Sequence, residues 1–136
     1  MSVLILQGPH TGDAPVPLPA NWAGHDLHTV RYRDIGALVA GLRAVRAGDD
    51  VAMVLLESGD LRRPECRAAW PALRSALDQL PVPYIELHAD AGEALEPWLH
   101  PNHAPLATLI TPRDRQRGYA MSQAITVRRL GAGHAQ

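Results

Sequence analysis

The chain has 136 residues, of which 46% are apolar, and a formal net charge of -1, a composition that predicts one globular domain over residues 1–136. The charge balance argues against a global basic field for nucleic acid and against an acidic solvating tail. The single Cys66 excludes an internal disulfide framework, and we expect neither a secretory leader nor a membrane span, because no run of about 20 apolar residues occurs. We therefore expect a cytoplasmic protein with no membrane or nucleic-acid partner.

The first part of the chain alternates between strand and helix patterns. Residues 2–8 form a continuous apolar run, which predicts a strand buried on both faces. Residues 11–24 hold too many prolines and glycines for a long helix and are predicted as a loop, and the more polar run 27–32 is predicted as a strand near a sheet edge. Asp34 can cap a helix with one apolar face, which ends at Gly48.

The same alternation continues to the end of the chain. Strands are predicted over residues 51–57, 83–88 and 106–111. Helices are predicted over residues 64–80, with a kink or a start near Pro71, over residues 92–99, and for about 18 residues after Asp114. Strands that alternate with helices predict a parallel sheet covered on both faces, whose ligands bind outside the carboxyl ends of the strands.

Polar side chains gather at those predicted carboxyl ends. They are Gln7, His10, Glu57, Ser58, Asp60, Glu86, His88 and Asp90. Glu86 and His88 stand two residues apart in a strand and therefore share one of its faces. They form either a pair hydrogen-bonded to each other or to the backbone at a strand end, or a catalytic pair in a pocket.

Four stretches of the sequence carry a family likeness. VLILQGPH at 3–10 is similar to an opening strand with an Asn-Gly-Pro-Asn turn, and DVAMVLLESGDL at 50–61 takes the place of a strand that ends in Asn-Pro-Gly. PALRSALDQLPVPYIELH at 71–88 matches a helix and a strand that ends in Glu-Val-His, and HPNHAPLATLITPRDRQRGY at 100–119 keeps a His, a Pro-x-Ala-Thr and a Gly-Tyr. In this order the stretches resemble the type II 3-dehydroquinate dehydratases of the shikimate pathway.

The resemblance implies a flavodoxin-like three-layer sandwich with a parallel sheet. The first crossover helix would be shortened or absent, because only residues 9–26 connect the first two strands. The family assembles as trimers and dodecamers, and a dimer is the alternative here if the missing helix exposes a new surface. Its enzymes remove water from a small-molecule substrate through an enolate and use no metal or organic cofactor.

The family's functional positions carry over in part. By resemblance, the candidate catalytic residues are His88, Glu86 and His10, and the candidate substrate-binding residues are Glu57, Gly59, Ala89 and Asp90. Glu57 replaces the Asn of Asn-Pro-Gly, and Asp90 replaces a Ser beside the carboxylate-binding backbone. One like-charge repulsion at about 4 Å and an effective dielectric near 20 costs roughly 4 kcal/mol, so two acidic replacements disfavour the anionic dehydroquinate.

The family's base, a Tyr on the loop after the first strand, has no counterpart here. TGDAPVPLPANWAGHD at 11–26 contains neither Tyr nor Arg, and Tyr32 and Arg31 lie too close to the second strand to replace them. We predict a dehydroquinase-like protein that has lost dehydratase activity and has a remodelled small-molecule pocket. Trp22 and Leu18, with nearby prolines, or a partner subunit, would cover the sheet where the helix is missing.

Two other functions remain open at this point. An active dehydratase with a rebuilt site would use His10, His88 or Tyr32 as base and Arg62 or Arg63 to bind the anion. A metal-dependent enzyme would use His10, His88, Glu57 and Asp90 as ligands. The last predicted helix is basic, with Arg113, Arg115, Arg117, Arg128 and Arg129, and we interpret it as a solvated face partly paired with Asp114.

Overall fold

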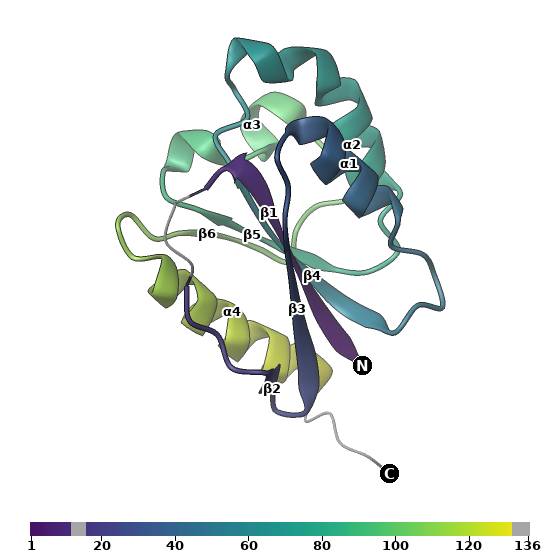
Figure 1. The fold of residues 1–136 in the computed structure, drawn as a ribbon, viewed down its shortest axis with the longest axis vertical. Coiled ribbons are helices and arrows are strands. Elements are labelled where there is room, and N and C mark those ends of the chain that lie inside the picture. Colours follow the sequence, from purple (N-terminus) through teal and green to yellow (C-terminus); the bar gives the residue numbers. More distant parts are fainter. Residues whose placement is uncertain (12–15, 132–136) are drawn as a thin grey trace.

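The computed structural model describes residues 1–11 and 16–131, which form an α/β fold around a curled six-stranded sheet (Figure 1). The strands are β1 (Ser2–His10), β2 (Asn21–Trp22), β3 (His25–Arg31), β4 (Val51–Gly59), β5 (Tyr84–His88) and β6 (Ala107–Ile110). Their order across the sheet is β2-β3-β1-β4-β5-β6. All neighbouring strands are parallel except the short β2, which pairs antiparallel with β3.

Helices cover both faces of this sheet, as the alternating pattern predicted. They are α1 (Ile35–Arg43), α2 (Trp70–Asp78), α3 (Glu96–Leu99) and α4 (Arg115–Leu130), with 3₁₀ turns η1 (Pro64–Ala69) and η2 (Ala91–Glu93). In Figure 1, α1, α2 and α3 lie on one side of the sheet and α4 lies on the other. The predicted parallel sheet between helix layers is confirmed, with β2 as an added antiparallel edge.

Local sequence signals explain where most helices begin. The side chain of Asp34 accepts a hydrogen bond from Ala37 N at 2.8 Å and caps α1 as expected. The continuous helix predicted over residues 92–99 is wrong, because η2 and α3 are separate. Ala94 between them is extended, with ψ 139°, and the N–H of Leu95 donates to the carboxylate of Glu86 at 3.2 Å instead of to a helical carbonyl.

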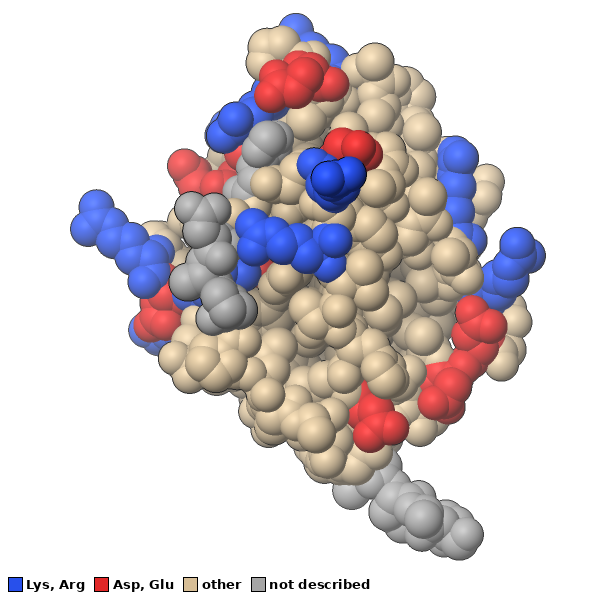
Figure 2. All heavy atoms as spheres, viewed as in Figure 1, with Lys and Arg blue, Asp and Glu red and all other residues tan. Residues whose placement is uncertain are grey.

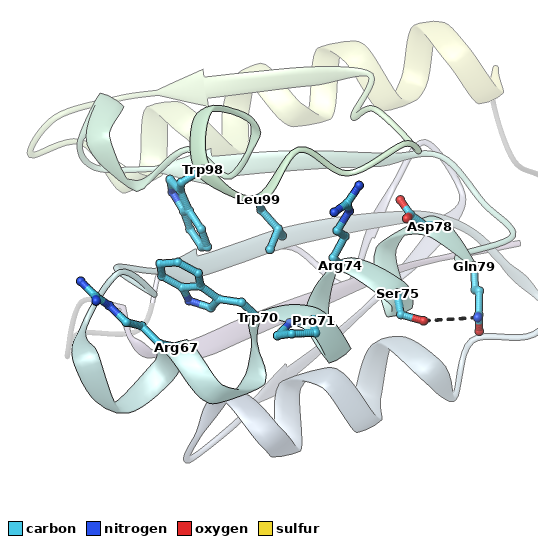
Figure 3. A pocket seen from close by; sticks show the side chains of 9 residues that line it. All are labelled: Arg67, Trp70, Pro71, Arg74, Ser75, Asp78, Gln79, Trp98 and Leu99. Carbon is cyan, nitrogen blue, oxygen red and sulfur yellow. Dashed lines mark hydrogen bonds between the residues drawn. The ribbon is translucent and has the colours of Figure 1, made fainter.

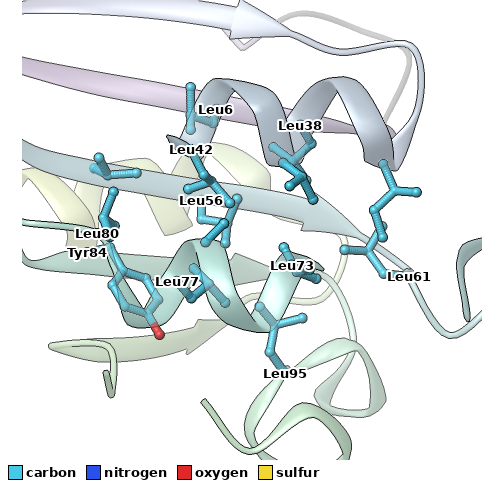
Figure 4. Packing of buried hydrophobic residues seen from close by; sticks show 14 of the residues in the cluster. Leu6, Leu38, Leu42, Leu56, Leu61, Leu73, Leu77, Leu80, Tyr84 and Leu95 are labelled. Atoms are coloured by element: carbon cyan, nitrogen blue, oxygen red, sulfur yellow. The ribbon is translucent and has the colours of Figure 1, made fainter. Parts of the chain in front are cut away.

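One hydrophobic core lies between the sheet and α1, α2 and α3. Buried side chains from strands β1, β4 and β5 pack there against side chains from η1 and the three helices (Figure 4). They include Leu6, Leu38, Leu42, Leu56, Leu61, Leu73, Leu77, Leu80, Tyr84 and Leu95. Because residues in a strand alternate, Glu86 and His88 lie on this same face of β5 as Tyr84.

The second core lies on the α4 side of the sheet. Val3, Ile5, Met53 and Leu55 of the central strands pack there with Tyr119 of α4 and with Trp22, which is 1% exposed. The described part of residues 11–24 contains β2 and no helix, and the partly buried Val16 and Leu18 pack against this core. Trp22 and Leu18 therefore cover part of this face of the sheet.

Acidic and basic side chains are scattered over the face seen in Figure 2, with basic groups near its upper centre, and a broad area of its lower half is uncharged. This face therefore has no extended surface of one charge. Among the described residues, no helix is both long enough and apolar enough to cross a membrane.

Candidate functional site

The carboxyl ends of β4 and β5 enclose a cavity of about 70 Å³. Its lining includes Glu57, Gly59, His88, Ala89, Glu93 and Arg115. Gly59 ends β4 with φ +71°, and Ala89 directly follows β5. The structure thus brings four of the sequence-predicted residues, His88, Glu57, Gly59 and Ala89, together around one cavity at the edge where α/β proteins bind ligands.

Glu57 is the centre of a buried hydrogen-bond network on the α4 side of the sheet. Its Oε1 accepts from Gln7 Nε2 at 3.1 Å, from the Tyr119 hydroxyl at 2.8 Å and from Arg115 Nη2 at 2.8 Å. Its Oε2 accepts from Arg115 Nε at 2.7 Å. Both carboxylate oxygens therefore have protein donors, and Arg115 binds them in the bidentate geometry that is common for a guanidinium and a carboxylate.

Hydrogen bonding, charge and burial shift the pKa values of Arg115 and Tyr119 in this network. Hydrogen bonds to Glu57 raise the pKa of the Arg115 guanidinium above its ordinary value. Burial, reinforced by the negative charge of Glu57, raises the pKa of Tyr119. Tyr119 is therefore a neutral hydrogen-bond donor at physiological pH and is poorly suited to act as a base.

Glu86 and His88 form a separate pair on the opposite face of the sheet. His88 Nε2 lies 2.7 Å from Glu86 Oε1, and both side chains are 0% exposed. Glu86 Oε1 also accepts from the N–H of Leu95 at 3.2 Å. Glu86 Oε2 and His88 Nδ1 are buried and have no hydrogen-bond partner within the described part of the chain. The geometry is that of a hydrogen-bonded strand-end pair, and His88 is also a lining residue of the cavity although its side chain is 0% exposed.

Asp90, a candidate substrate-binding residue in the sequence, lies outside the cavity, and Glu93, to which sequence reasoning assigned no role, lines it. The Asp90 carboxylate is exposed and accepts from Gly92 N at 2.7 Å, so it caps η2 and does not line the cavity. Glu93 lines the cavity instead, and burial raises its pKa while nearby His88 opposes that rise. Sequence reasoning missed Glu93 because it fell inside the wrongly predicted 92–99 helix.

Arg115 is the second residue that sequence reasoning missed. The sequence pattern indicates a solvated basic face, but the side chain of Arg115 is only 20% exposed and binds Glu57. Two signals could have identified it. Arg115 is the first residue of a helix that follows the last strand, and a buried carboxylate such as Glu57 requires a cationic partner.

The residues proposed for the alternative functions are dispersed. The backbone of His10 pairs with Gly59, but its side chain lies outside the described residues. Tyr32 packs against Gly41 of α1, and burial raises its pKa. Arg62 is bound to Asp60 through Nε at 2.9 Å and Nη2 at 3.1 Å, which holds the pKa of Asp60 low. Neither Tyr32 nor Arg62 lines the cavity.

A metal-binding group is also missing from the part of the chain that the structure describes. No group of three or more His, Cys, Asp or Glu side chains there could hold a metal ion. Among the four residues considered as ligands, Glu57 binds Arg115 and Asp90 caps η2. Cys66 is buried in the core on the helix face, the cluster against which Trp70 also packs.

Comparisons of the chain with protein-family models, with curated proteins and with solved structures find no match.

Proposed function

We propose that this protein has a flavodoxin-like, type II dehydroquinase-like scaffold that has lost dehydratase activity, and that its cavity binds a different small molecule. The strand order β3-β1-β4-β5-β6 supports the flavodoxin-like scaffold, because it corresponds to the order 2-1-3-4-5 of that fold when β2 is set aside. The stretches at 3–10, 50–61, 71–88 and 100–119 support the likeness to the dehydroquinase family.

The pairing of Arg115 with Glu57 is the observation that carries the loss of activity. Dehydroquinate is a carboxylate, so its site needs cations or other donors directed at the substrate. Arg115 is the only arginine in the described lining of the cavity, and two of its nitrogens donate to Glu57. Glu57 and Glu93 both line the cavity with this one guanidinium, so the described lining has more carboxylates than cations, and one unbalanced repulsion costs roughly 4 kcal/mol at about 4 Å and an effective dielectric near 20.

Neither a base nor enough space for this substrate is found among the residues that the structure describes. Residues 11–26 contain no Tyr, the Tyr119 hydroxyl donates to Glu57, and His88 Nε2 is directed at Glu86. A cavity of about 70 Å³ is well below the ~300 Å³ of small ligand pockets. We infer that its ligand is small, carries hydrogen-bond donors and is neutral or cationic.

A turnover assay tests the loss of activity. The purified protein is incubated with 3-dehydroquinate, and formation of the conjugated enone of dehydroshikimate is followed by ultraviolet absorbance and mass spectrometry. We expect no product above the protein-free control. Turnover above the protein-free control would contradict the proposal and identify an active dehydratase with a rebuilt site.

A pair of small probes tests the proposed ligand chemistry. Methylammonium and acetate are similar in size and opposite in charge, and both are titrated into ¹⁵N-labelled protein. We expect methylammonium to shift the amide resonances of Gly59 and Ala89 and acetate to leave them unchanged, because the lining holds two carboxylates and one guanidinium. A larger response to acetate would contradict this assignment.

We also propose that the chain forms a homo-oligomer, a trimer or dodecamer as in the family that it resembles, with a dimer as the alternative. β6 is at one edge of the sheet and the two-residue β2 is at the other. Light scattering on the eluted protein measures the mass, and a monomer across the concentration range would overturn the proposed assembly.

A further inference from the structure

A much larger hollow lies between α2 and α3, and it shares no lining residue with the cavity at the strand ends. This groove has a volume of about 600 Å³, which falls within the ~300–1,000 Å³ of small-molecule pockets. Figure 3 shows Trp98 of α3 lying over Trp70 of α2, with Arg67 at one end of the groove and Arg74 toward the other. Leu99 of α3 also lines the groove and adds to its apolar surface.

The two tryptophans form a fixed aromatic surface. Their ring centroids are 4.5 Å apart, with an interplanar angle of 40°. Trp70 Nε1 donates to the carbonyl of Leu61 at 2.9 Å, which holds that ring in place. Both residues are only half-buried, so part of each ring remains available to a ligand. Aromatic surfaces of this kind bind planar rings by offset stacking.

The charges around the tryptophans favour an anion. Arg67 lies over the Trp70 ring, with its guanidinium carbon 5.9 Å from the centroid. Within the described residues, neither Arg67 nor Arg74 has a carboxylate within ion-pair distance. The acid of the groove, Asp78, is engaged elsewhere, because it accepts from Asn102 N at 2.6 Å and from His103 N at 3.2 Å.

We propose that this groove is a binding site for a planar aromatic anion, such as an aromatic carboxylate. The ring packs against the parts of Trp70 and Trp98 that remain exposed, and the carboxylate accepts hydrogen bonds from Arg74 or Arg67. The groove therefore selects for two properties together, an aromatic ring and a negative charge. This site is independent of the function proposed for the strand-end cavity.

The indole N–H resonances provide a direct test. The chain has three tryptophans, and Trp22 is buried on the other side of the sheet, so its resonance is an internal control. We expect 2-naphthoate to shift the indole signals of Trp70 and Trp98 but not of Trp22, with a Kd of about 1 mM or tighter. The neutral 2-naphthalenemethanol and the non-aromatic cyclohexanecarboxylate should each bind several-fold more weakly.

Variants separate the two parts of the recognition. Arg74→Gln should weaken naphthoate binding about two- to fivefold, the range of an exposed ion pair, and leave binding of 2-naphthalenemethanol unchanged. Arg43→Gln removes an exposed arginine at the end of α1 and should leave both unchanged. Trp98→Leu should weaken both ring-containing probes, and Trp98→Phe keeps an aromatic ring if the leucine variant does not fold.

Three results would overturn the proposal. The first is no shift of either groove tryptophan at saturating naphthoate, and the second is equal binding of naphthoate and 2-naphthalenemethanol. The third is an oligomer that dissociates in Trp98→Leu or Trp98→Phe, because the groove would then be a contact between two copies of the chain. Each of these outcomes leaves the dehydroquinate assay and the strand-end cavity unaffected.

Discussion

Arg115 joins the start of α4 to the end of β4, because its Nε lies 2.7 Å from Glu57 Oε2 and its Nη2 lies 2.8 Å from Glu57 Oε1. The two residues are 58 positions apart in the sequence. The side chain of Glu57 is 9% exposed and that of Arg115 is 20% exposed. This pair both closes the candidate cavity on one side and anchors α4 over the sheet.

The first prediction concerns the energetic coupling of this pair. Glu57→Gln and Arg115→Gln should each lower the free energy of unfolding by about 1–3 kcal/mol, because each leaves a largely buried charge without its partner. The double variant should lose less than the sum of the two, which a double-mutant cycle by urea denaturation measures. Asp60→Asn, at the solvent-screened Arg62 pair, should change stability much less. Additive losses at Glu57 and Arg115 would contradict the coupling.

The second prediction is a loss of stability at alkaline pH. Burial raises the pKa of Tyr84 and of Tyr119 in the folded protein, whereas an unfolded tyrosine titrates near about 10. Above that pH the unfolded chain releases protons that the folded chain retains. The free energy of unfolding should therefore fall by up to about 1.4 kcal/mol per pH unit for each such tyrosine, and this contribution is fully present below pH ~10.

Urea denaturation between about pH 8 and pH 11 measures this slope. The chain contains no lysine, so no ε-ammonium group titrates over the same range. Tyr119→Phe should reduce the slope, although it also removes the hydroxyl that donates to Glu57. Phenolate absorbance that rises while the protein is still folded would contradict a raised tyrosine pKa.

Local rules predicted much of this fold. Apolar runs identified β1 and β4, and Asp34 identified the start of α1, because strand burial and helix capping depend on neighbouring residues. A local rule was also available for Asp90. An Asp two residues before a Gly commonly accepts a hydrogen bond from the backbone of its own turn, as Asp90 does from Gly92 N.

Such local rules could not predict contacts between elements that are far apart in the sequence. The partner of Arg115 depends on where α4 crosses the sheet, which no periodicity in residues 115–130 reveals. Glu93 lines the cavity because the Leu95 N–H bonds to Glu86 and breaks the helix expected there. The antiparallel β2 was likewise unpredicted, because its two residues form a strand only by pairing with β3.

The third prediction concerns Gly8, where β1 approaches the end of β4. A methyl group at this position would overlap the carbonyl oxygen of Ser58, which is part of the backbone and cannot turn away. Gly8→Ala should therefore lower the midpoint of urea unfolding strongly, with a loss of about 3 kcal/mol or more. Gly36→Ala is the matched control in α1, because its methyl group would meet only Asp34 Oδ1 at 3.4 Å. Equal stability of the two variants would contradict the close approach.

The fourth prediction concerns the buried pair of Glu86 and His88. His88→Leu leaves Glu86, which is 0% exposed, with the Leu95 N–H as its one remaining donor. Removal of one partner from a buried pair costs about 3–5 kcal/mol, so His88→Leu should be strongly destabilised in urea. His28→Leu, at an exposed position of β3, is the control and should change stability little.

The double variant Glu86→Leu/His88→Leu distinguishes a lost contact from a stranded charge. It removes the carboxylate together with its partner, and the apolar side chains can pack with Tyr84 and Leu95 in the same core. The Leu95 N–H then lacks an acceptor, at a cost of about 1–3 kcal/mol, so the double variant should not regain full stability. It should nevertheless be more stable than His88→Leu alone. If it is less stable, the destabilisation of His88→Leu comes from lost packing around the imidazole and not from an unpaired carboxylate in the core.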